Sequence, residues 1–214
     1  MTDLVLHGYW RSSAAYRVRI ALNLKGADYR QLTHDLRQGA QRSPDYLALA
    51  PHGLVPALEC DGSVLIESPA ILEWIDARWP SPPLLPRAID DAAIVRAMAA
   101  LIGCDIHPLN NLRVLNRLKS DLGASGDQVQ SWIAHWIEQG FSALETLIAR
   151  HGRGFAFGDS ATLADCYLVP QVYGARRFAV DLSPYPHLTA AADAAAALEP
   201  FQNAHPDAQP DADR

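Results

Sequence analysis

A proline-rich segment divides the sequence into two parts of different character. Residues 80–86 hold four prolines within seven positions, a density that excludes both a helix interior and a central strand. Short apolar runs typical of strands occur before this segment, whereas after it the apolar residues recur at helical spacing. We therefore predict an α/β domain over residues 1–80, a stiff linker over 81–87, an all-helical domain over 88–203 and a disordered polar tail over 204–214.

The first part predicts a β–α–β unit followed by a β-hairpin. The expected strands span residues 4–6, 29–33, 57–60 and 64–66, and the first helix spans 17–25. Gly26 stands where a helix end favours glycine, and the dipeptide Asp61-Gly62 between two apolar runs is a strong hairpin signal. Ser68 as N-cap and Pro69 as the first helical residue predict another helix before the linker.

Composition and charge restrict the classes of partner. The chain carries a formal net charge of −6, which argues against nucleic acid because phosphate binding needs a basic surface. The three cysteines form no C-x-x-C pair, which favours a reducing compartment and no metal site; Cys104 and Cys166 lie in apolar helical patterns and are expected in the core. The start lacks a signal-peptide pattern and no apolar run could span a membrane, so we predict a cytoplasmic protein.

Two serines stand at the expected junction between the first strand and the first helix. The N–H groups at a helix start favour an anion, and the hydroxyl of Ser12 or Ser13 could donate to it, so a thiol bound there would ionise more readily. The competing interpretation is that one of these serines only caps the helix, and the turn by itself favours that interpretation.

Two residue pairs in the first part could hold a peptide-like ligand. If the Val55-Pro56 bond is cis, the Val55 backbone would face outward and could pair with an extended ligand; a trans bond would be an ordinary strand start. Ser68 at a helix N-terminus can bind a carboxylate, and Glu67 beside it can bind an ammonium. The alternative for this second pair is a helix cap beside a solvated acid.

The helical part contains one segment that breaks the rules of helix composition. We expect helices over 90–119, 127–150, 162–174 and 187–198, with a capping box at Thr162 and Asp165. Residues 103–113 concentrate glycine, aspartate and asparagine around Pro108, which should kink the first of these helices. Such a violation is expected at a functional site, and the alternative is a kink that serves packing only.

Arginines in both parts could bind the carboxylates of a substrate. Arg11 follows the first strand, Arg113 ends the unusual segment, and Arg176 and Arg177 lie near the end of a predicted helix. A guanidinium can bind a carboxylate through two parallel hydrogen bonds. The alternative is a solvated surface arginine, which is the better interpretation for any single arginine taken alone.

Taken in order along the chain, these segments resemble the zeta class of the glutathione transferases. Residues 12–22 resemble the N-terminal signature of that class, and 105–115 resemble its segment in the helical domain. Residues 55–58 and 67–71 resemble the thioredoxin-like domain of the whole superfamily. The resemblance covers residues 4–200 and implies the glutathione transferase fold, a thioredoxin-like glutathione-binding domain followed by an all-helical substrate domain, assembled as a homodimer.

The resemblance also implies a reaction and its residues. Glutathione would be the cofactor of a cis–trans isomerisation that converts a small dianionic keto acid, maleylacetoacetate or maleylpyruvate, to its fumaryl isomer. The implied catalytic residues are Ser12, Ser13, Arg11, Arg113 and Arg176. The implied glutathione-binding residues are Ser12, Ser13, Arg17, Gln41, Val55, Pro56, Glu67, Ser68, His107, Asn111 and Arg113.

Two other functions are compatible with the same fold. One is a general transferase that conjugates glutathione to small electrophiles or haloacids, which would favour an apolar second pocket; the candidate arginines argue against it. The other is a non-catalytic binding protein, which would lack affinity for glutathione. Ala14 stands where many zeta-class enzymes have a cysteine, so no thiol is available at that position. Within the resemblance, Trp10-Arg11-Ser12 together with Asn110-Asn111 and Arg176-Arg177 favours the maleylpyruvate branch, in which arginines bind the carboxylates of the substrate.

Overall fold

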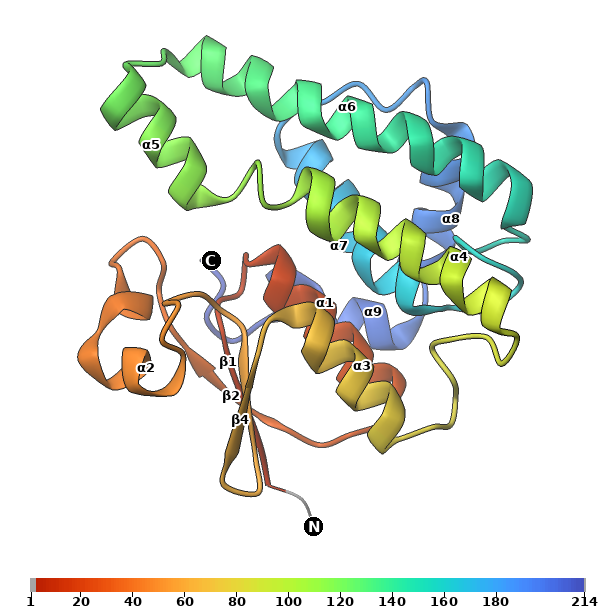
Figure 1. Ribbon diagram of the computed structural model, residues 1–214, viewed down its shortest axis with the longest axis horizontal. Helices are drawn as coiled ribbons and strands as arrows, with labels where there is room; N and C mark the ends of the chain where they lie inside the picture. The colour runs from red at the N-terminus through yellow and green to blue at the C-terminus, as the bar shows by residue number, and fades with distance from the viewer. Residues whose placement is uncertain (1–2, 214) are drawn as a thin grey trace. The chain divides into compact units, whose positions relative to one another are not determined.

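The structure, a computed structural model, describes residues 3–213 and contains two compact units (Figure 1). The first unit comprises Met1–Leu84 together with Ala197–Arg214, and the second comprises Leu85–Ala196. The change from one unit to the other thus falls inside the proline-rich segment. The end of the chain differs from our expectation, because residues from Ala197 onward belong to the first unit instead of continuing the helical one.

The first unit is built on a four-stranded mixed sheet. Its strands are β1 (Leu4–Gly8), β2 (Arg30–Thr33), β3 (Ala57–Cys60) and β4 (Ser63–Ile66), in the order β2-β1-β3-β4. β1 and β2 are parallel, as a β–α–β unit requires, and β3 is antiparallel to both β1 and β4. Asp61 and Gly62 adopt φ angles of 47° and 81°, which suit a tight two-residue hairpin turn. The predicted β–α–β unit and hairpin are confirmed.

Helices cover both faces of this sheet, with α1 (Ser13–Leu24) and α3 (Ser68–Arg78) on one side and α2 (Pro44–Leu49) on the other (Figure 1). α1 is buried along most of its length and packs against α3 and α9 (Glu199–Ala204). It ends at the predicted glycine, since Gly26 has a φ angle of 60° and the Ala27 N–H donates back to the Leu22 carbonyl.

The last residues of the chain are folded, so the prediction of a disordered tail over 204–214 is wrong for the part that the structure describes. A short 3-10 helix, η3 (Pro206–Ala208), follows α9, and Gln209 beyond it is buried. The buried guanidinium of Arg19 donates from Nε to the Ala204 carbonyl at 2.9 Å. A buried charge needs acceptors, and this polar segment supplies one, which its composition alone does not reveal.

The second unit is a helical bundle in which α7 (Leu163–Arg177) packs against several neighbours. The others are α4 (Ile89–Ala100), the π-helix η2 (Leu101–Ile106), α5 (Leu112–Leu122), α6 (Gly126–His151) and α8 (Pro186–Ala196). α7 contacts α4, η2 and α8. The predicted capping box is confirmed, because the Asp165 carboxylate accepts hydrogen bonds from the backbone N–H and the hydroxyl of Thr162.

The prediction of one kinked helix over 90–119 is wrong. α4 ends at Ala100, the chain continues as the π-helix η2, and α5 begins only at Leu112. A π-helix bonds groups that are five positions apart, one more than in an α-helix, so the apolar spacing of a regular helix no longer indicates which side chains are buried. Cys104 on η2 is accordingly exposed and the core prediction for it is wrong, whereas Cys166 is buried as predicted.

Candidate functional site

The junction between β1 and α1 is a tight turn that ends at Ser12. The Ser12 N–H donates to the Tyr9 carbonyl at 3.0 Å, and the Ser12 hydroxyl oxygen accepts from the Ala15 N–H at 3.2 Å. Ser12 is therefore the N-cap of α1, and Ser13 is the first helical residue. Capping uses only a lone pair of the hydroxyl oxygen, so the same group can still donate its hydrogen to an anion. The two interpretations of Ser12 are compatible.

The start of α3 is tied to α1 by a buried pair of polar side chains. Arg17 Nη1 donates to Ser68 Oγ at 3.3 Å, and both residues are buried. Ser68 is the first residue of α3 and Glu67 occupies the cap position, so the predicted N-cap lies one residue too late. Glu67 has a φ angle of 69°, a strained conformation for a residue with a side chain. Its carboxylate is largely exposed, with a fractional side-chain exposure of 61%.

The Val55–Pro56 peptide bond is cis, which is the first of the two alternatives set out above. Within residues 3–213, no hydrogen bond joins the N–H or the carbonyl of Val55 to another group. The backbone of Val55 therefore keeps its pairing capacity for a ligand.

A partly buried series of polar side chains lies behind the loop that precedes β3. His7 Nε2 lies 2.5 Å from Glu59 Oε1, and His7 Nδ1 lies 2.8 Å from His34 Nε2. Burial, with a smaller effect of neighbouring His7, lowers the pKa of His34. The Tyr46 ring packs on His34 with centroids 4.3 Å apart, and its hydroxyl donates to the Leu54 carbonyl at 2.6 Å. The loop is thus held from the core of the first unit.

Two buried polar atoms near these loops have no hydrogen-bond partner within the described part of the chain. They are Oε1 of Gln41, in the 3-10 helix η1 (Ala40–Arg42), and Nδ1 of His52. The other ring nitrogen of His52 lies 3.8 Å from Glu67 Oε1. Because buried polar groups are almost always paired, such atoms are candidates to contact a ligand. Gln41 was predicted here; His52 was not, and its only signal was a polar side chain within a turn-forming Pro-His-Gly sequence.

In the second unit, the predicted residues lie around the start of α5. His107 follows η2, and Asn111 is the N-cap of α5, with Oδ1 accepting from the Arg113 N–H at 3.1 Å. Arg113 is exposed and borders a hollow of about 550 Å³. Residues of α5 line that hollow: Arg113, Val114, Arg117, Leu118, Asp121 and Leu122. Of the predicted residues in this unit, Asn111 and Arg113 are joined at the start of α5, whereas Arg176 lies on α7.

The predicted substrate arginines differ in their surroundings. The Arg11 guanidinium carbon lies 5.2 Å from the centre of the Trp10 ring. Arg176 Nη2 donates to Asp193 Oδ1 at 2.8 Å, and about half of each side chain is exposed. In this structure Arg176 is therefore a surface arginine, which is the alternative interpretation given above. Arg177 lies over the Phe178 ring at 4.7 Å.

The described residues offer neither a metal centre nor a membrane-spanning helix. Residues 3–213 contain no group of three or more histidine, cysteine, aspartate or glutamate side chains arranged to hold a metal ion. None of the helices in the same part of the chain has the length and apolar character needed to cross a bilayer.

Known proteins match this chain along nearly its whole length. The family model for the N-terminal domain of glutathione S-transferases matches residues 11–78, and that for their C-terminal domain matches 130–207. A maleylacetoacetate isomerase of Pseudomonas aeruginosa is 51% identical over 209 residues, which is 96% of this chain and 97% of that protein.

Solved structures of related proteins are also similar to this chain along nearly its whole length. A holo maleylpyruvate isomerase, described as a bacterial zeta-class glutathione S-transferase, superposes with a TM-score of 0.96 and 47% identity, covering 98% of this chain and all of the other. A maleylacetoacetate isomerase of Anaeromyxobacter dehalogenans with glutathione bound in its active site has a TM-score of 0.90 and 44% identity, covering 99% of both chains.

Proposed function

The chain belongs to the zeta class of the glutathione S-transferase family, and from this premise we propose that it isomerises a maleyl keto acid, maleylpyruvate or maleylacetoacetate, with glutathione as cofactor. The observation that carries the proposal is the pair of helix starts, α1 at Ser13 and α3 at Ser68, that the buried Arg17–Ser68 hydrogen bond joins. Each helix start offers backbone N–H groups to an anion, so this arrangement suits a ligand with two negatively charged groups.

The residues of the first unit fit glutathione, which is an extended tripeptide with a thiol, two carboxylates and an ammonium group. Ser68 at the start of α3 would bind the carboxylate of the γ-glutamyl end, and the exposed Glu67 carboxylate would bind its ammonium. The unpaired backbone of Val55, before Pro56, would pair with the cysteinyl residue. The buried, unpaired Oε1 of Gln41 would accept from the amide N–H of the glycyl residue.

The proposed role of the α1 start is to favour the thiolate form of the cofactor. Bound glutathione supplies a thiolate that adds reversibly to the maleyl double bond and so permits rotation about it. The Ser12 hydroxyl would donate its hydrogen to the sulfur, and the N–H groups of the first turn, Ser13 among them, would favour its negative charge. Both effects stabilise the charged sulfur, so the thiol ionises at a lower pH than it does in water.

The proposed role of the arginines is to fix the two carboxylates of the substrate and to stabilise negative charge on its carbonyl oxygen. Arg11 and Arg113 are the principal candidates, with His107 and Asn111 contributing polar groups near Arg113. Arg176 would have to exchange Asp193 for a substrate carboxylate. That pair is half exposed, and such surface ion pairs contribute only about 0–1 kcal/mol, so the exchange is inexpensive.

The test of the proposed function is a direct assay with both substrates. Folded protein, glutathione and either maleylpyruvate or maleylacetoacetate are mixed, and the loss of substrate absorbance is followed with and without glutathione. We expect glutathione-dependent isomerisation, with the higher kcat/KM identifying the preferred substrate. A chloro-aromatic electrophile and a haloacid are assayed in parallel. Turnover of these alone, or no glutathione-dependent reaction, would contradict the proposal.

The oligomeric state is proposed on the family resemblance, and the location on the three widely spaced cysteines, which suit a reducing compartment. We propose a homodimer in the cytoplasm. Light scattering on the purified protein measures the mass of the particle, and a mass of 23.3 kDa, that of one chain, would contradict the dimer.

A prediction for glutathione binding follows from the position of Glu67. Replacing it by glutamine removes the charge that would attract the γ-glutamyl ammonium and keeps the size of the side chain. We expect KM for glutathione to rise about tenfold, because a hydrogen bond to a charged group is lost, while kcat changes less than about twofold. Glu138→Gln, on the exposed face of α6, is the matched control. An unchanged KM in Glu67→Gln would remove Glu67 from the proposed site.

A further inference from the structure

We propose that the end of the chain, residues 205–213, is a strap that positions the turn carrying Arg11 and Ser12, and that Asp211 is its positioning residue. The proposal rests on the proposed function for the meaning of that turn. The strap itself is defined by contacts within the first unit. It ties Trp10, in the turn at residues 9–12, to a side chain 201 positions later in the sequence.

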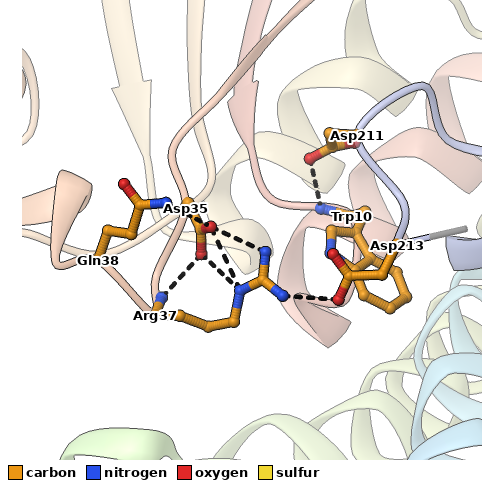
Figure 2. Close-up of polar contacts among 6 residues, drawn as sticks. All are labelled: Trp10, Asp35, Arg37, Gln38, Asp211 and Asp213. Atoms are coloured by element: carbon orange, nitrogen blue, oxygen red, sulfur yellow. Dashed lines mark hydrogen bonds and ion pairs between the residues drawn. The ribbon is translucent and has the colours of Figure 1, made fainter.

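Both backbone polar groups of Trp10 are held by side chains. The Trp10 N–H donates to Asp211 Oδ2 at 3.0 Å, and the Trp10 carbonyl accepts from Arg19 Nη2 at 2.9 Å (Figure 2 shows the first of these). Within residues 3–213 the Trp10 N–H has no other acceptor. Trp10 is a central residue of the turn that the Ser12 N–H closes on the Tyr9 carbonyl, so fixing the Trp10 peptide groups fixes the course of the turn.

The strap is anchored along its length, so Asp211 is not the loose end of a chain. The strap begins directly after Ala204, whose carbonyl accepts from Arg19 Nε, so one buried guanidinium binds both the residue before the strap and the turn. Gln209 is buried and its amide donates to two backbone carbonyls, those of Asn203 and His205. Ala212 packs against the apolar cluster that contains Trp10. These anchors keep the Asp211 carboxylate at a fixed place.

The last anchor of the strap, the ion pair between Asp213 and Arg37, is weaker than the others. Asp213 Oδ2 lies 2.6 Å from Arg37 Nη1, but both side chains are about half exposed (Figure 2). Arg37 is also bound through several nitrogens to Asp35, which holds it without the strap. Exposed pairs of this kind contribute little, whereas Asp211 supplies the acceptor for a turn N–H that otherwise has none. We therefore assign the positioning role to Asp211 and only a minor attachment role to Asp213.

The consequence for the reaction is geometric. Ser12 lies two residues beyond Trp10. A turn that loses one of its two side-chain attachments therefore holds the Ser12 hydroxyl less firmly against the sulfur of glutathione. Misplacement of a reacting group by about 1 Å can reduce a rate about 100-fold, and partial freedom of the turn reduces it less. Asp211 touches neither glutathione nor substrate in this scheme; it acts through Trp10.

The test compares Asp211→Ala with two matched variants. We expect Asp211→Ala to reduce kcat/KM about tenfold, to raise the pKa of the bound glutathione thiol in an ultraviolet titration of thiolate absorbance, and to speed hydrogen exchange of the Trp10 amide. Asp211→Asn keeps an oxygen acceptor and should recover most of the wild-type values. Asp207→Ala changes an exposed aspartate of the same segment and should leave all three unchanged.

Two outcomes would overturn the strap. One is a wild-type thiol pKa and Trp10 exchange rate in Asp211→Ala, and the other is the same loss in Asp207→Ala. A chain that ends at Pro210 provides a second variant, which should reproduce the Asp211→Ala result. The failure of the proposed function is distinguishable, because a wild-type protein that isomerises neither maleyl acid still gives a Trp10 exchange rate and a glutathione titration that decide the role of Asp211.

Discussion

Replacing Ser12 by alanine is expected to lower kcat/KM for the glutathione-dependent isomerisation by about 100-fold. A loss of this size is typical when one preorganised hydrogen-bond donor to an anion, here the glutathione thiolate, is removed. The Ser12 hydroxyl accepts from the Ala15 N–H and so has its hydrogen left to donate. Without it, the bound thiol ionises at a higher pH and less thiolate is present at neutral pH. Steady-state kinetics and a thiolate titration of the complex measure both effects.

The same substitution also removes a helix cap, so the experiment must separate the two losses. Glycine caps almost as well as serine, costing only about a few tenths of a kcal/mol, but has no hydroxyl. Ser12→Gly should therefore be as inactive as Ser12→Ala with nearly wild-type stability, and Ser12→Thr should retain both properties. Ser13→Ala decides between the two serines of the turn. Full activity in Ser12→Gly would contradict the proposed role of the hydroxyl.

Replacing Asp165 by alanine is expected to destabilise the second unit by about 3–5 kcal/mol, because it breaks a buried network and leaves its donors unpaired. The Asp165 side chain is fully buried. Its carboxylate accepts from the Ala156 N–H at 2.8 Å, from the Thr162 N–H at 2.8 Å and from the Thr162 hydroxyl at 2.9 Å. Chemical unfolding measures the loss, with the exposed Asp159→Ala as control. A loss below about 1 kcal/mol would contradict the assignment.

The loss in Asp165→Ala should depend on pH in a defined direction. Burial raises the pKa of Asp165 from 3.8 to about 6, although the hydrogen bonds oppose the shift. A raised pKa means that the folded protein binds the proton more tightly, so this contribution to stability is complete below pH 3.8 and is lost as the pH rises through 6. The difference between wild type and Asp165→Ala should therefore grow by about 1 kcal/mol from about pH 7 to about pH 5.

The elements with strong local signals were predicted correctly. Asp61-Gly62 identified the hairpin, Gly26 the end of α1, and the capping box at Thr162 the start of α7. α2 was missed because its helix is only six residues long, too short for a periodic apolar pattern, although Ser43 and Pro44 mark its start. The interruption between α4 and α5 was recognised as unusual, but a π-helix has no distinct local signature.

Local rules predict the position of a candidate residue where it depends on neighbours in sequence, and they do not predict contacts between distant residues. Ser12, Glu67 and Ser68 lie at helix starts, which local rules identify. Asp211 is 201 positions from Trp10, and nothing in a polar, proline-containing tail indicates which backbone N–H it will bind. Contacts of this kind depend on which distant residues the fold brings together, so local sequence patterns do not predict them.

The division of the first unit between the two ends of the chain has a consequence for synthesis. On the ribosome, Met1–Leu84 emerges before the helical unit, whereas α9, which packs on α1, emerges after it. One side of α1 therefore stays uncovered while the ribosome synthesises the entire helical unit. The first unit can complete its folding only after the helical unit has been synthesised, and a chain that stops before Ala197 lacks the helix that packs on α1.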